Sequence, residues 1–134
     1  MKSTRADLNG TGYVVRLETG EDLLETLQRF VAEEGIRNAA IVSAIGSASS
    51  WRFHVVASAE IPPREAFPQG DGPVDICHMQ GYVLDGRLHA HVTFADARTA
   101  FGGHLESGVR VLTFAVVTLV LLPDDLGIAT WDRL

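Results

Sequence analysis

The chain has 134 residues, of which 46% are hydrophobic and 21% charged, a composition typical of one soluble globular domain. The formal net charge is −6, and the 11 basic residues form no run, which disfavours direct nucleic-acid binding because that requires clustered Lys and Arg. The single cysteine excludes an internal disulfide framework and a cysteine-rich zinc cluster.

The chain opens on the polar, unpatterned stretch MKSTRADLNG, for which we predict a flexible segment over residues 1–10. A single domain is predicted over residues 11–134, because the length suits one hydrophobic core and no internal repeat is visible. No apolar segment of the kind found in secretory signals occurs at the start, so we expect a cytoplasmic protein.

A strand is predicted at residues 13–17, followed by an amphipathic helix. Counting from Leu23, apolar residues recur at i, i+1, i+4, i+7 and i+8, which places them on one face of a 3.6-residue repeat. Thr19 with Asp22 resembles a capping box before this helix, and Gly35 is the expected cap after it.

The rest of the chain reads mainly as strands and loops. In chain order we predict strands at 38–49 and 51–58, a proline-rich loop at 61–73, strands at 74–84 and 87–95, a loop at 96–108 and a strand at 109–122. Asp85-Gly86 fits a type I′ hairpin turn. The apolar run 111–122 is too short to span a membrane and favours a buried strand. These elements predict an α+β fold, a mostly antiparallel sheet with one main helix packed on it.

Three of the five histidines lie within residues 89–105. Alternation along a strand puts His89 and His91 on one face with Cβ atoms about 7 Å apart, so both imidazoles can reach one ion. His104 follows Gly102-Gly103, where we predict a turn that returns it over the same face. Three imidazoles with an open position are a known zinc arrangement, although iron, nickel and cobalt also accept imidazole. The alternative is that these histidines are exposed polar residues on a solvated strand.

Other polar residues give further candidates. Glu106 is a candidate general acid or base, the alternative being a solvated loop carboxylate. Arg16 and Arg52 lie on strands and are candidates for holding an anionic ligand, the alternative being surface ion pairs. His78 lies on the partner strand of the hairpin and is a further candidate ligand, whereas His54 is predicted to be structural or exposed.

Several segments of the chain resemble the plants and prokaryotes conserved (PPC) domain. They are TGEDLLETLQRFVAEEGI, AAIVSAIGSAS, GPVDICHMQGYV, DGRLHAHVTFAD and FGGHLESGVRV. The chain departs from the family where GPVDIC replaces a Gly-Arg-Phe-Glu-Ile-Leu core. The resemblance implies a compact domain that assembles as a homotrimer. It also implies metal binding by His89, His91 and His104, the histidines that match the zinc ligands of the similarly folded acetolactate decarboxylase.

These observations lead to three functional hypotheses, the third being a homotrimer that serves only as a protein-interaction scaffold. The first is a zinc-dependent enzyme or binder of a small carboxylate or carbonyl metabolite, with Glu106 and Arg16 as candidate catalytic residues. The second, suggested by plant members of the family, is a DNA-associated or regulatory interaction module without an AT-hook. We expect no membrane partner.

Overall fold

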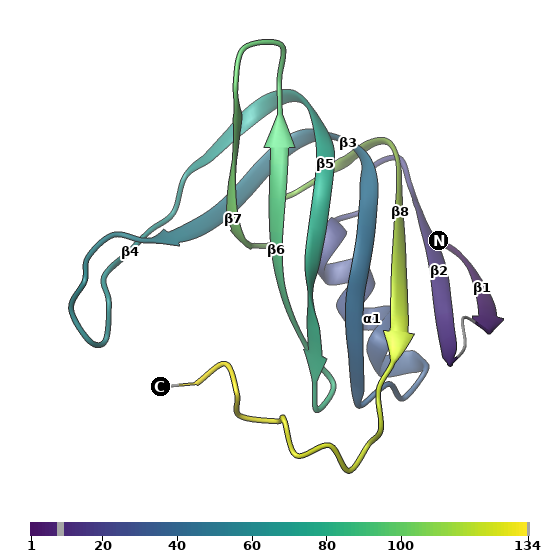
Figure 1. The fold of residues 1–134 in the computed structure, drawn as a ribbon. Coiled ribbons are helices and arrows are strands. Elements are labelled where there is room, and N and C mark those ends of the chain that lie inside the picture. The colour runs from purple at the N-terminus through teal and green to yellow at the C-terminus, as the bar shows by residue number, and fades with distance from the viewer. Residues whose placement is uncertain (8–9, 134) are drawn as a thin grey trace.

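The computed structural model describes residues 1–7 and 10–133, with side chains described for residue 1 and residues 10–133. One antiparallel sheet dominates the fold, with the one helix of the described residues packed behind it (Figure 1), so the predicted α+β class is confirmed. The elements are β1 (Lys2–Asp7), β2 (Thr11–Glu18), α1 (Leu23–Glu33), β3 (Asn38–Val56), β4 (Glu65–Ala66), β5 (Gln69–Leu84), β6 (Arg87–Ala95), β7 (Ala100–Leu105) and β8 (Val111–Leu121). The strand order is β1-β2-β8-β3-β5-β6-β7, with β4 paired to β3.

The N-terminal segment pairs with the sheet despite its lack of pattern. Lys2–Asp7 forms β1 and pairs with β2 from Lys2↔Arg16 to Asp7↔Thr11. Backbone groups at a free sheet edge pair whatever their side chains are, so alternation is not needed for this strand. Residues 8 and 9 lie outside the described residues. Within the described part of the chain, no helix is long and apolar enough to cross a membrane.

Helix α1 covers one face of the sheet with the apolar stripe that the sequence predicts. Its buried residues join the core formed by β2, β3, β5, β6 and β8. The N-cap is Asp22 rather than Thr19, because the Asp22 side chain accepts a hydrogen bond from the Glu25 N–H at 3.0 Å. Thr19 instead donates to the Thr113 carbonyl of β8. Gly35 ends the helix with a φ of 63°, as predicted.

The two strands predicted over residues 38–58 are one strand, β3, of 19 residues. Irregularities in its pairing with β8 lie between Ile41 and Ser43 and between Gly46 and Ala48. Such bulges bend a strand, so β3 does not read as one regular alternation. Its first part pairs with β8 and β5, whereas Phe53 and His54 near its end pair with β7.

Residues 100–105, predicted as part of a loop, form the strand β7, and this correction matters most for function. Gly102 and Gly103 are not in a turn. They allow a close approach of backbones, because a Cβ on Gly102 would lie 1.9 Å from the Val92 carbonyl oxygen and one on Gly103 would lie 2.4 Å from that of His54. β7 therefore pairs with β6 on one side and with β3 on the other. The four strands β3, β5, β6 and β7 thus close into a ring.

Aromatic side chains fill the space between these strands. Phe53 from β3, Phe94 from β6 and Phe101 from β7 pack with ring centroids 6.0–6.4 Å apart. Trp51 lies 4.7 Å from Phe101, measured between ring centroids. This apolar packing holds the neighbouring residues of each strand on the opposite, outward face.

We predict that Gly102→Ala destabilises the protein by about 2 kcal/mol, because the added methyl group forces β7 away from β6. Urea unfolding of both proteins measures this difference in free energy. Gly10→Ala is the control, since a Cβ there meets nothing within 4 Å, and equal loss of stability in the two variants would contradict the prediction.

Candidate metal centre

Strand register brings the histidines together. His91 of β6 is the cross-strand partner of His104 of β7, and His104 is in turn the partner of His54 of β3. Cross-strand partners share a face with Cβ atoms about 5 Å apart, so these three side chains form a row. His89 lies two residues before His91 on the same face, while Leu88 and Ala90 are buried on the other, as the alternation predicts.

The rings of His89, His91 and His104 lie close together on the outer face of the sheet. Their centroids are separated by 5.7 Å between His89 and His91, 4.6 Å between His89 and His104, and 5.6 Å between His91 and His104. The structure therefore brings together the three histidines that the sequence singles out. It does so through strand pairing, rather than through the predicted glycine turn.

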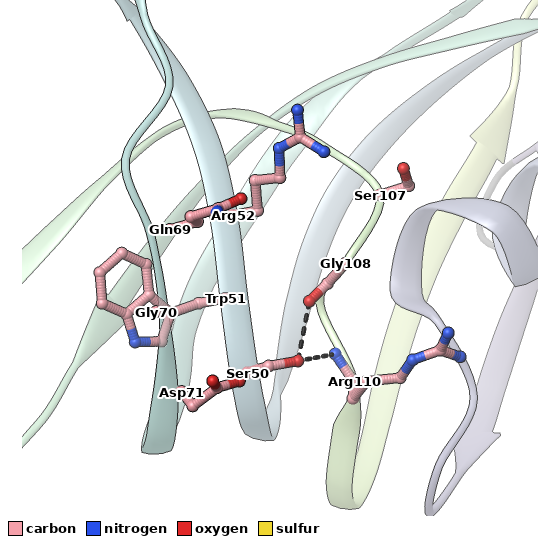
Figure 2. A pocket seen from close by; sticks show the side chains of 9 residues that line it. All are labelled: Ser50, Trp51, Arg52, Gln69, Gly70, Asp71, Ser107, Gly108 and Arg110. Carbon is pink, nitrogen blue, oxygen red and sulfur yellow. Dashed lines mark hydrogen bonds between the residues drawn. The ribbon is translucent and has the colours of Figure 1, made fainter.

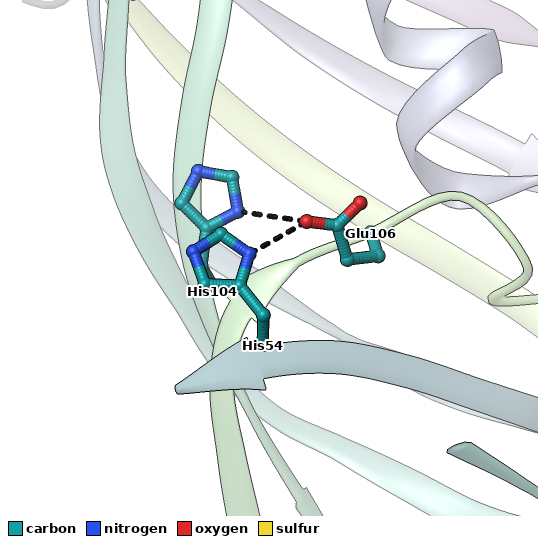
Figure 3. A group of neighbouring side chains, drawn as sticks. All are labelled: His54, His104 and Glu106. Carbon is teal, nitrogen blue, oxygen red and sulfur yellow. Dashed lines mark hydrogen bonds and ion pairs between the residues drawn. The ribbon is translucent and has the colours of Figure 1, made fainter. Parts of the chain in front are cut away.

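His54 and Glu106 belong to the same cluster (Figure 3). The Nδ1 atom of His54 donates to Glu106 Oε1 at 2.6 Å, and its ring stacks on that of His104 with centroids 4.2 Å apart. The ligand atoms of His54, His104 and Glu106 all lie within 4.8 Å of one another, close enough for one metal ion. Sequence reasoning missed His54 because nothing local shows that β3 reaches β7.

An unpaired nitrogen lies at the centre of this cluster. Among the described residues, His104 Nδ1 is buried without a hydrogen-bond partner, and Glu106 Oε1 is 3.7 Å away. Buried polar atoms in proteins are nearly always paired, so this nitrogen fits the role of a ligand atom.

The surroundings of His91 and His104 favour the neutral imidazole, the form that binds metals. Burial lowers the pKa of His104, and the neighbouring His54 and His89 lower it further. Burial likewise lowers the pKa of His91, with His89 and His54 adding to the effect. A neutral imidazole has a free lone pair, which an ion can accept at neutral pH without first displacing a proton.

Asp132 of the C-terminal tail fixes the orientation of the His89 ring. Asp132 accepts a hydrogen bond from His89 Nδ1 at 3.0 Å and pairs with both terminal nitrogens of Arg87. The hydrogen bond from Arg87 holds the pKa of Asp132 far below its ordinary value, so the carboxylate stays ionised. A carboxylate that fixes one nitrogen of an imidazole leaves the other, here Nε2, oriented for a metal.

Two candidates from the sequence lie apart from the cluster. Arg16 is on β2, separated from β3 by β8, and its guanidinium pairs with Glu18 and lies over the Phe114 ring. His78 is exposed on β5 opposite Thr93. Of the two candidate catalytic residues, only Glu106 lies beside the histidines.

The chain matches the family model described as the Plants and Prokaryotes Conserved (PCC) domain over residues 4–123. It belongs to this family. A crystal structure of a metal-containing protein from Archaeoglobus fulgidus is 30% identical in sequence, with a TM-score of 0.74 over 84% of this chain and 80% of that one. The family assignment thus agrees with the resemblance carried by the histidine-containing segments.

Two further comparisons, one of sequence and one of structure, match this chain to parts of longer proteins. Bifunctional GlmU proteins from two Synechococcus strains are 30% and 28% identical over 84% and 80% of this chain, which spans only 17% and 16% of their length. Acetolactate decarboxylase from Bacillus subtilis has a TM-score of 0.58 and 15% identity over 82% of this chain and 52% of its own. The decarboxylase comparison shows a shared fold.

We predict that Asp132→Ala releases the C-terminal tail, because Arg87 and His89 lose the carboxylate that binds it to β6. Amide hydrogen exchange over residues 126–133 should accelerate at least severalfold. Asp125→Ala, an exposed change in the same tail, is the control, and equal exchange in the two variants would argue against this role.

Proposed function

We propose that this Plants and Prokaryotes Conserved domain protein binds a divalent transition-metal ion, zinc in the first instance, through His89, His91 and His104. The metal centre would serve to bind or transform a small metabolite that carries a carboxylate or carbonyl group. The observation that carries the proposal is the proximity of the three imidazole rings, whose centroids lie 4.6–5.7 Å apart. The relative from Archaeoglobus fulgidus, which is described as metal-containing, supports it.

Ring spacing favours these three histidines over the set that includes His54. Two imidazoles bound to one tetrahedral ion through bonds of about 2.0–2.1 Å have centroids about 5 Å apart. The three separations of 4.6–5.7 Å bracket that value, whereas His54 and His104 stack at 4.2 Å. His54 Nδ1 is also already bonded to Glu106. We therefore assign His54 the role of holding the Glu106 carboxylate beside the ion.

The space beside the histidines suits a small ligand. A cavity of about 620 Å³ opens along β3, β5 and β6, where its lining residues include Val42, Gln80, Tyr82, His89 and His91. A metal ion held at such a site polarises a carbonyl or carboxylate oxygen or lowers the pKa of a bound water. Glu106, held by His54 and partly accessible, would exchange a proton with a ligand bound to the ion on its side of His104.

We predict that His91→Ala and His104→Ala lower the affinity for zinc at least a hundredfold, because each removes one of three ligands. His54→Ala should retain zinc, with a smaller loss. Metal content of untagged protein by mass spectrometry, followed by competition titration with a chelator, measures the affinities. Absence of a bound transition metal in the wild-type protein after zinc loading would refute the proposed function.

The same variants separate the two possible ligand sets. If His54, His104 and Glu106 hold the ion instead, His54→Ala loses the metal and His91→Ala keeps it.

Cobalt-substituted protein then tests the ligand class, because a carboxylate such as oxalate that enters the coordination sphere changes the visible spectrum of the ion. Unchanged spectra with oxalate and with pyruvate would contradict binding of a carboxylate or carbonyl compound at the metal.

We further propose that the protein assembles as a homotrimer through the sheet face away from α1. Large apolar side chains are exposed there, including Val42 (49%), Ile45 (55%), Tyr82 (52%) and Phe114 (38%). Several exposed apolar residues on neighbouring strands favour a protein interface, since isolated domains rarely leave such a face uncovered. The metal centre opens on the same side of the sheet, so a neighbouring copy would border it.

We expect sedimentation velocity to show a trimer for the wild-type protein and a monomer for Ile45→Glu, because the new carboxylate would be buried in the interface. Ile61→Glu is the matched control, since Ile61 is 85% exposed in the long loop after β3. A wild-type monomer, or equal effects of the two changes, would contradict the assembly.

A further inference from the structure

A second cavity lies apart from the one beside His89 and His91. It has a volume of about 530 Å³ and opens between the middle of β3, the start of β5 and the segment after β7 (Figure 2). Its lining residues are Ser50, Trp51, Arg52, Gln69, Gly70, Asp71, Ser107, Gly108 and Arg110. Polar and cationic groups therefore dominate its wall.

The two arginines of this cavity have no acidic partner within 4 Å among the described residues, unlike five other arginines. Five arginines with described side chains have an acidic partner within 4 Å, and they are Arg16, Arg29, Arg37, Arg64 and Arg87. Among the described residues, neither Arg52 nor Arg110 has one, although Asp71 also lines the cavity. Two guanidinium charges against one carboxylate leave this cavity cationic, in a chain with a formal net charge of −6.

Arg52 also holds a buried donor without an acceptor. Its Nε atom is buried and makes no hydrogen bond to any described residue. A guanidinium stays charged in proteins, so it cannot relieve this by losing a proton. An anion in the cavity would supply the countercharge that the guanidinium groups of this cavity lack.

The wall between the two arginines is fixed before any ligand arrives. Ser50 Oγ donates to the Gly108 carbonyl at 2.8 Å and accepts from the Arg110 N–H at 3.3 Å (Figure 2). The Gly108 N–H donates to Asp22, the N-cap of α1, at 2.7 Å. Gly108 has a φ of 109°, which favours glycine and shapes the segment that carries Ser107. Such fixed walls lower the entropy lost on binding.

We propose that this cavity is a binding site for the anionic group of a small molecule, a phosphate or a carboxylate, held by Arg52 and Arg110. Guanidinium groups recognise both anions through paired N–H donors. The site requires no metal, so it extends beyond the proposed function. Each of the two proposals can be correct without the other.

The test uses the full chain after removal of metal with EDTA, so that an anion bound to the metal centre is not mistaken for one bound here. Inorganic phosphate and malonate are titrated separately, while NMR follows the Nε–H signal of Arg52 and calorimetry measures affinity. We expect a saturable shift of this signal, and the tighter of the two probes identifies the class of anion.

Matched variants assign the binding to these side chains. Arg52→Gln and Arg110→Gln should each weaken binding about tenfold or more, because each removes a charged donor. Arg64→Gln, an exposed arginine paired with Glu60, is the control that should leave binding unchanged. Asp71→Asn should tighten binding, since it removes the one carboxylate of the cavity. Arg110→Gln carries the test if Arg52→Gln fails to fold.

Three results would overturn the proposal. The first is the absence of a saturable shift with both probes at 10 mM, which is about a hundredfold above a typical metabolite KM. The second is equal affinity for the anion in Arg110→Gln and Arg64→Gln. The third is binding that disappears when metal is removed. Retained zinc binding in Arg110→Gln would show that the metal centre is intact, so a failure of the anion site is distinguishable from a failure of the proposed function.

Discussion

The double pairing of β7 is the constraint on which the rest of the structure depends. β7 fits between β6 and β3 because Gly102 and Gly103 have no side chains to keep the neighbouring backbones away. Only the pairing of β7 with both neighbours closes the four strands into a ring. It packs Phe53, Phe94 and Phe101 against one another inside. It also places His54 and His104 on a shared outer face. Stability and the candidate site therefore come from the same backbone contact.

The segment that leaves β7 connects the candidate metal centre to the cationic cavity. Glu106 bonds to His54, and the next two residues, Ser107 and Gly108, line the cavity of Arg52 and Arg110. Arg52 lies two residues before His54, on the same strand. Neighbouring strands thus present two chemically different sites, one made of imidazoles and one lined by two guanidinium groups that have no acidic partner among the described residues. The C-terminal tail adds a third element, since Asp132 supports His89 from outside the sheet.

Local patterns predicted much of the fold because they depend on neighbours along the chain. The apolar stripe of α1, the Asp85-Gly86 hairpin and the alternation around His89 and His91 are all such patterns, and the structure contains each of them. Local patterns gave wrong strand predictions where segments distant in the sequence pair with each other. The alternation predicts two strands where β3 is one, because bulges interrupt it, and paired glycines predict a loop where β7 is a strand, because they resemble a turn.

The sequence by itself determined the α+β class and the alternation that puts His89 and His91 on one face, because composition, alternation and motif spacing are properties of the chain. Only the tertiary structure decided that His54 and Glu106 join them, that Arg16 does not, and that Arg52 and Arg110 share a cavity. Each of these facts depends on which strands pair and in what register. A shift of one residue in the pairing of β7 would turn His104 to the other face, and nothing local in the sequence specifies that pairing.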